Sequence, residues 1–209
     1  MNNDMKSRLI TWGERLFRMR SYTPIPLFLV MFSCFWWEWE NNLMVWCCGL
    51  FFVACGEGLR LWSLRYIGRF SRTTRKRKGN ALVMDGPYTL VRNPLYCGNL
   101  LILIGATILS ELLWFIPIVI TLFALQYYCI VLWEEEGLLK NFPEETERYF
   151  RSVPRWLPSW HSIQKYFEQN RTADYPWLNV LRREQSTLLG LLTMVTFMMV
   201  KELFVSKFF

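Results

Sequence analysis

The sequence predicts an all-α integral membrane bundle of about five transmembrane helices, folded as one domain over residues 1–209. Of the 209 residues, 53% are hydrophobic and only 20% are charged, whereas a soluble domain carries about 25% charged residues. The hydrophobic residues gather in five apolar stretches, and the basic residues gather in alternate loops between them. No internal repeat and no Pro/Ser-rich linker divides the chain, so we expect a single domain.

The five apolar stretches differ in length. A spanning helix needs about 20 residues, with a range of about 17–25. The second and fourth stretches satisfy this, whereas the first and third need neighbouring residues to complete them. The fifth is interrupted by Lys201 and Glu202, so a buried helix is the alternative there. The stretches are residues 24–37, 43–61, 96–109, 112–133 and 187–205.

The distribution of basic residues predicts the orientation of the bundle. Counted over the loops, 22 of the 24 Lys and Arg residues fall on one side of the five stretches. The positive-inside rule makes that side cytoplasmic, with the N-terminus inside and the C-terminus outside. The first 20 residues lack the apolar core of a signal peptide. We therefore expect an inner bacterial membrane or the endoplasmic reticulum membrane.

Composition also excludes several classes of site. The six cysteines lie in apolar runs without a CxxC pair, and His161 is the single histidine, so we expect reduced thiols and no metal site. There is no P-loop and no complete dinucleotide-binding glycine motif. The net charge of +7 indicates membrane lipids as partners rather than nucleic acid. The basic cluster at residues 75–78 is accordingly expected to anchor lipid headgroups, with a substrate site as the alternative.

The third and fourth stretches are separated only by Ser110 and Glu111, which predicts an antiparallel helical hairpin. Gly98 and Gly105 lie on the third stretch and permit close helix contact, with a ligand role as the alternative. A short interfacial helix is expected over residues 144–150, and Trp156 and Trp160 indicate a segment that lies back on the membrane.

The cytoplasmic ends of this hairpin carry the candidate site. Asn93 is a favourable N-cap and Pro94 a favourable first helical residue. Because a helix N-terminus attracts anions and Arg92 adds a positive charge, the carboxylate of a small ligand is expected there. Glu134 directly follows an apolar run, where a carboxylate is costly without a partner. We expect Asn93 and Glu134 to be neighbours, although a solvated Glu134 is the alternative.

At these residues the chain resembles the isoprenylcysteine carboxyl methyltransferase and phospholipid methyltransferase superfamily, over about residues 56–158. The resemblance is carried by Gly86-Pro87-Tyr88, Val91-Arg92-Asn93-Pro94, Tyr96, Gly98, Glu134-Glu135, Phe142, Tyr149, Val153-Pro154-Arg155 and Pro158. It implies a small integral membrane enzyme that uses S-adenosylmethionine in a cytoplasmic cofactor pocket without a Rossmann domain.

The resemblance also implies roles for individual residues. Arg92, Asn93 and Glu134 would be catalytic, with Asn93 and the helix N-terminus holding the methionine carboxylate of the cofactor. Arg155 would bind the substrate. The acceptor would be lipophilic (an isoprenylcysteine carboxylate, a phospholipid or a thiol) and would enter from the bilayer. The implied cofactor contacts are Asn80, Ala81, Leu82, Val83, Tyr88, Asn93, Pro94, Tyr96 and Glu134.

Four positions depart from the family pattern. Asn93 stands where members often have His, and Pro143 and Thr146 replace a usual Gly and Tyr. Ile130 replaces the Arg that meets the substrate one turn before the acidic residue, so a carboxylate substrate would need Arg92 or Arg155 instead. An NADPH-dependent membrane reductase of related scaffold and a non-catalytic membrane interaction protein are the alternative functions.

Overall fold

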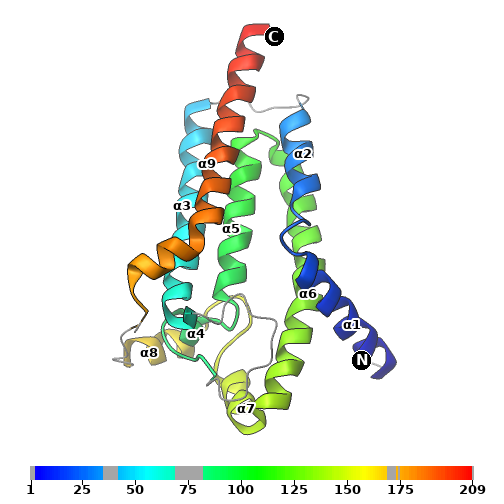
Figure 1. Ribbon diagram of the computed structural model, residues 1–209, viewed down its shortest axis with the longest axis vertical. Helices are drawn as coiled ribbons and strands as arrows, with labels where there is room; N and C mark the ends of the chain where they lie inside the picture. The colour runs from blue at the N-terminus through cyan, green and yellow to red at the C-terminus, as the bar shows by residue number, and fades with distance from the viewer. Residues whose placement is uncertain (1–2, 35–41, 69–81, 169–172, 174, 209) are drawn as a thin grey trace.

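The computed structural model describes residues 3–34, 42–68, 82–168, 173 and 175–208, and these residues form helices and no strands. The long helices α3, α5, α6 and α9 run along the bundle, while α4, α7 and α8 gather at one end (Figure 1). The predicted all-α class is therefore confirmed. The elements are α1 (Asn3–Met19), α2 (Ile25–Ser33), α3 (Asn42–Ile67), α4 (Pro87–Leu90), α5 (Pro94–Leu109), the 3-10 helix η2 (Leu113–Phe115), α6 (Ile116–Asn141), α7 (Pro143–Ser152), α8 (Trp160–Glu168) and α9 (Trp177–Phe208).

Within the described residues, three helical segments are long and apolar enough to cross a membrane: Leu43–Ile67, Leu113–Asn141 and Trp177–Leu203. They contain the second and fourth predicted stretches and most of the fifth. The third stretch is the apolar helix α5, which has 16 residues. The first is represented by α2, whose nine residues reach only about 14 Å at 1.5 Å per residue. The chain is thus a membrane protein.

The most extensive helix pair among the described residues is α3 with α5, and glycines make that approach possible. A Cβ on Gly56 of α3 would lie 2.7 Å from the carbonyl oxygen of Gly98, and one on Gly105 would lie 2.7 Å from that of Gly49. Real side chains cannot occupy those positions, so the two backbones are nearly in contact. The close contact predicted for Gly98 and Gly105 is confirmed, and their partner is α3 rather than the hairpin partner α6.

The predicted hairpin is also present. Helix α5 ends at Leu109, and Glu111 turns the chain with a φ of 64°, in the left-handed region. Beside this turn, the buried Lys201 of α9 donates hydrogen bonds to the carbonyl oxygens of Ser110 (3.0 Å) and Met31 (3.3 Å). A cation near two helix C-termini is favourable. Lys201 therefore ties α9 to the ends of α2 and α5, and helix α9 continues through it.

Helix α1 packs across α6 near the end of the bundle that carries α7 (Figure 1). A Cβ on Gly13 would lie 2.7 Å from the Cβ of Trp133. The buried ring of Phe17 has its centroid 4.9 Å from that of Trp133. Gly13 and Phe17 thus define the inner face of α1.

Candidate functional site

The site begins at a short buried turn before α5. Gly86 precedes α4 with a φ of 61°, and a Cβ there would lie 2.5 Å from the ring of Tyr66. Only glycine suits both the left-handed backbone and that space. After α4, the backbone N–H of Arg92 donates to the carbonyl oxygen of Pro154 at 2.8 Å. The start of α5 is therefore joined to the segment that follows α7.

Asn93 occupies the predicted N-cap position of α5, but its side chain forms no capping hydrogen bond. Its Nδ2 donates instead to the carbonyl oxygen of Arg155, at 3.1 Å. The thiol of Cys97 contacts the carbonyl oxygen of Trp156 at 3.4 Å. The predicted capping role of the Asn93 side chain is thus wrong. Asn93 instead ties the first turn of α5 to the chain after α7 through its side-chain N–H.

The three consecutive acids at the end of α6 have three different sets of partners. Glu134 accepts a hydrogen bond of 2.9 Å from the hydroxyl of Tyr96. Glu135 is buried and binds Arg92 and Arg155, whereas Glu136 binds Lys6 and Lys140, each at 3.3 Å. Successive helical residues point about 100° apart at 3.6 residues per turn, which separates the three carboxylates.

Glu135 lies between two guanidinium groups. Arg92 Nη1 is 2.7 Å from Glu135 Oε1, and Arg155 reaches both oxygens, with Nε at 2.9 Å and Nη2 at 2.6 Å. The Arg92 guanidinium also lies over the Phe150 ring, 4.4 Å from its centroid. Burial lowers the pKa of Arg92, an effect that Glu135 opposes. Hydrogen bonding to Glu135 raises the pKa of Arg155, so both arginines are engaged by an acid that the sequence did not single out.

Tyr96 connects Glu134 to an aromatic wall. Its ring centroid lies 4.6 Å from that of Tyr127 on α6, and Tyr127 in turn stacks on Phe123 at 4.1 Å. The cytoplasmic ends of α5 and α6 therefore meet through Tyr96 and Glu134. Because Asn93 lies one turn before Tyr96, the residues that the sequence placed at these two helix ends are brought to one region.

Tyr88 carries an unsatisfied polar group into this region. Its side chain is 7% exposed, and its hydroxyl has no hydrogen-bond partner within the described part of the chain. Burial, assisted by Tyr149 and Glu134 and opposed by Arg60, raises its pKa well above the ordinary value. The Tyr149 hydroxyl fixes α4 by donating to the carbonyl oxygen of Tyr88 at 2.8 Å. Tyr88 thus holds a buried, protonated donor at α4.

The remaining predicted cofactor residues are less informative. Leu82 and Val83 are half-buried before α4, and Pro94 is buried at the first position of α5. Asn80 and Ala81 lie outside the described residues, as does the basic cluster 75–78.

A second polar cluster, which sequence reasoning missed, lies deeper in the bundle. Arg60 of α3 binds Glu184 of α9 at 2.6 Å and Asn99 of α5, and Asn99 Nδ2 donates to the Tyr127 hydroxyl at 3.1 Å. Glu57 is 7% exposed and lies 3.4 Å from Arg60 Nε, yet its carboxylate accepts no hydrogen bond from any residue that the structure describes. The sequence feature that could have revealed this cluster is the pair of ionisable residues Glu57 and Arg60, which lie three positions apart in an apolar helix.

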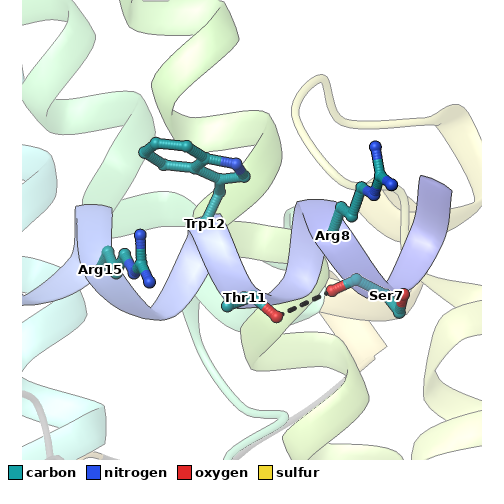
Figure 2. A pocket seen from close by; sticks show the side chains of 5 residues that line it. All are labelled: Ser7, Arg8, Thr11, Trp12 and Arg15. Carbon is teal, nitrogen blue, oxygen red and sulfur yellow. Dashed lines mark hydrogen bonds between the residues drawn. The ribbon is translucent and has the colours of Figure 1, made fainter. Parts of the chain in front are cut away.

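Arg20 is a further cation that sequence reasoning did not assign to the site. It follows α1, donates to the Phe17 carbonyl oxygen at 2.6 Å and lies 3.8 Å from the Phe17 ring centroid. Its charge acts on Glu134. A hollow of about 230 Å³ lies elsewhere, on α1 (Figure 2), and none of the predicted site residues lines it.

Comparison with known proteins identifies the family. Residues 43–145, from α3 into α7, match the family described as phospholipid methyltransferase. No solved structure matches. The chain is also 34% identical over 148 residues to the cobalt-zinc-cadmium resistance protein CzcN of Cupriavidus metallidurans. The matched region covers 66% of this chain and 64% of that protein.

A second relative is the nickel-cobalt-cadmium resistance protein NccN of Alcaligenes xylosoxydans xylosoxydans. It is 34% identical over 110 residues, or 53% of this chain and 48% of that protein. The chain thus spans less than two thirds of the length of both relatives. The predicted resemblance to the isoprenylcysteine and phospholipid methyltransferase superfamily is therefore confirmed over residues 43–145, which contain both Tyr88 and Glu134.

Proposed function

We propose that the protein transfers a methyl group from S-adenosylmethionine to a lipophilic acceptor at the cytoplasmic face of the membrane. The observation that carries this proposal is the buried Tyr88 hydroxyl, which has no hydrogen-bond partner among the residues that the structure describes. An unsatisfied buried polar group costs about 1–3 kcal/mol. A polar ligand held between α4, α5 and α6 would satisfy it.

The residues present fit the chemistry of S-adenosylmethionine. Glu134 offers a carboxylate to its ammonium or hydroxyl groups, and Tyr88 offers a hydroxyl donor. The neighbouring rings of Tyr96 and Tyr127, tilted by 54° to each other, offer aromatic faces, which attract a cation such as a sulfonium. Asn93 uses one amide N–H on Arg155 and retains the other for the methionine carboxylate.

When bound, S-adenosylmethionine supplies an electrophilic methyl group, and transfer of that group is an in-line displacement. The protein therefore contributes mainly orientation and electrostatics. Glu135 holds Arg92 and Arg155 in place, and this fixes the chain after α7 against α5. Arg92, Asn93 and Glu134 thereby keep the mouth of the site in one geometry. Tyr96 holds the Glu134 carboxylate toward the interior.

The arrangement of charges bears on the acceptor. The two arginines expected to bind a carboxylate acceptor are both engaged by Glu135, and Ile130 is fully buried among apolar residues. A carboxylate acceptor would have to use Arg20, whose charge acts on Glu134. These charges support a phospholipid or thiol acceptor over an isoprenylcysteine carboxylate.

The proposed orientation places the N-terminus in the cytoplasm and the C-terminus on the opposite side. The N-terminal helix α1 lies toward the end of the bundle that carries α7, and the C-terminus lies at the other end (Figure 1). This arrangement is what the positive-inside rule predicts from the basic loops.

Cofactor binding by the purified protein tests the proposal. Titration calorimetry should show S-adenosylmethionine binding, and Glu134→Gln should weaken it about tenfold, because a hydrogen bond to a charged group contributes about 1.5–3 kcal/mol. Tyr88→Phe should also weaken it, since only the hydroxyl is removed. Glu145→Gln, an exposed acid on α7, is the matched control and should bind like the wild type.

The remaining outcomes separate the alternatives. Binding of NADPH in competition with the methyl donor would favour a reductase, and no binding of either nucleotide would favour a non-catalytic protein. Incubation of reconstituted protein with radiolabelled donor and a panel of prenylated cysteine, phosphatidylethanolamine and alkyl thiol identifies the acceptor. The same panel with Arg20→Gln shows whether a carboxylate acceptor depends on that cation.

A further inference from the structure

Helix α1 has an outer face that the bundle leaves uncovered. Its inner face is defined by Gly13 and Phe17, which pack on α6 near Trp133. Trp12, beside Gly13 in the chain, is 56% exposed and points away from that contact. Figure 2 shows the outer face with Arg8 and Arg15 on either side of Trp12.

The position of α1 along α6 places this face at the membrane surface. Its inner residues contact α6 at Cys129 and Trp133, which end the apolar run of that helix. The acids follow immediately, and Lys6 of α1 pairs with Glu136 at 3.3 Å. Helix α1 therefore crosses α6 where that helix leaves the hydrocarbon, at the depth where lipid headgroups lie and where exposed tryptophans are enriched.

The hollow on this face is positively charged. It has a volume of about 230 Å³ and is lined by Ser7, Arg8, Thr11, Trp12 and Arg15, with no acid among them. Arg15 lies 5.5 Å from the centroid of the Trp12 ring. Over the part of the chain that the structure describes, neither Arg8 nor Arg15 forms an ion pair, whereas Arg18 is paired with Glu14 at 2.6 Å.

We propose that this face of α1 binds the headgroup phosphate of an anionic membrane lipid through Arg8 and Arg15. Arg guanidinium groups match phosphate oxygens with two parallel hydrogen bonds. The two residues are seven positions apart, or about 10 Å along the helix, so the hollow between them suits a headgroup rather than a bare ion. A basic amphipathic helix in the interface is also the arrangement that anionic lipids attract.

Native mass spectrometry of the full-length chain, with phosphatidylglycerol or phosphatidylcholine added to the detergent, tests the site. The wild type should retain phosphatidylglycerol in preference to phosphatidylcholine. Each of Arg8→Gln and Arg15→Gln should weaken retention about fivefold, the scale of one basic residue near an anionic surface. The double variant should show the product of the two effects.

A matched control separates the site from net charge. The double variant Arg148→Gln/Arg151→Gln removes two exposed arginines from α7 and should retain phosphatidylglycerol like the wild type. An equal loss in that control, or equal retention of both lipids by the wild type, would overturn the proposal. If inorganic phosphate displaced bound phosphatidylglycerol as effectively as added phosphatidylglycerol does, the site would be one for free anions instead. Because α1 lies apart from Tyr88, cofactor binding should be unchanged in Arg8→Gln/Arg15→Gln, so this test does not depend on the proposed function.

Discussion

At the scale of single residues, Glu135 organises the mouth of the candidate site. It is one of eleven buried polar or charged residues in the described chain and satisfies two guanidinium groups at once. Since Arg92 approaches it from the start of α5 and Arg155 from the chain after α7, this single carboxylate joins three parts of the structure. Replacing Glu135 by an uncharged residue would leave the guanidinium groups of Arg92 and Arg155 facing each other without a counter-ion.

We expect Glu135→Gln to destabilise the protein by about 3 kcal/mol, the lower end of the cost of leaving buried charges unpaired. Guanidine or thermal unfolding in detergent measures this. Glu145→Gln serves as the exposed control and should unfold like the wild type. A Glu135→Gln protein as stable as that control would show that the ion pairs contribute nothing net.

Sequence reasoning found Glu134 but not Glu135, for a physical reason. The cost of a carboxylate beside an apolar run pointed to Glu134, and the structure gives that carboxylate a partner in Tyr96. The partners of Glu135 depend on how residues 153–156 fold back on α5, and no local pattern encodes that contact. The same fold-back explains why the Asn93 amide donates to Arg155 rather than capping its own helix.

At the scale of elements, the seam between α3 and α5 is the most constrained part of the bundle. Its four glycines are spaced seven residues apart on each helix, at 49 and 56 and at 98 and 105. This spacing repeats one face of a helix at two successive contacts. The seam holds Arg60 and Asn99 opposite each other, so packing at the glycines positions the deeper polar cluster.

We expect Gly105→Ala to destabilise the protein by about 1–3 kcal/mol, because the new methyl group must displace backbone or Val53. Gly190→Ala on α9 is the matched control, since no atom lies within 4 Å of its added Cβ. That variant should be as stable as the wild type or more so. Equal unfolding midpoints for the two variants would contradict a tight seam.

Hydropathy predicted the helices well and their ends poorly. The fourth apolar stretch ends at residue 133, but the helix was expected to continue past the three acids, and α6 does continue through them to Asn141. The fifth was expected from residue 187, whereas α9 begins at Trp177. Charged residues end an apolar pattern without ending a helix, because Glu, Lys and Arg are good helix formers.

At the scale of the whole molecule, α9 is held by a few polar contacts on an otherwise exposed helix. Glu184 binds Arg60 at 2.6 Å, Arg183 Nη1 donates to the Gly68 carbonyl oxygen at 2.8 Å, and Lys201 reaches the turn after α5. The sequence predicted the class, the hairpin and the apolar nature of these helices. It did not predict which helices touch, because in lipid that choice depends on small residues and on polar pairs far apart in the chain.

A double-mutant cycle between Arg60 and Glu184 tests this attachment. Arg60→Met removes the guanidinium from two buried carboxylates and should destabilise the protein by about 3–5 kcal/mol. Glu184→Gln should also destabilise it, and the double variant should lose clearly less than the sum of the two. Arg182→Met, an exposed neighbour on α9, is the control. Strict additivity would show that the pair does not hold α9.

The contact between Arg60 and Glu184 also sets an order for biogenesis. Translation delivers the helix with the guanidinium more than a hundred residues before the helix that carries Glu184, so in the nascent chain Glu57 of the same helix is the acid beside that cation. Insertion of the helix that carries Glu184 therefore completes the ion pairing of Arg60. A product truncated before α9 would expose Arg60, which Glu184 covers in the finished protein, to membrane quality control.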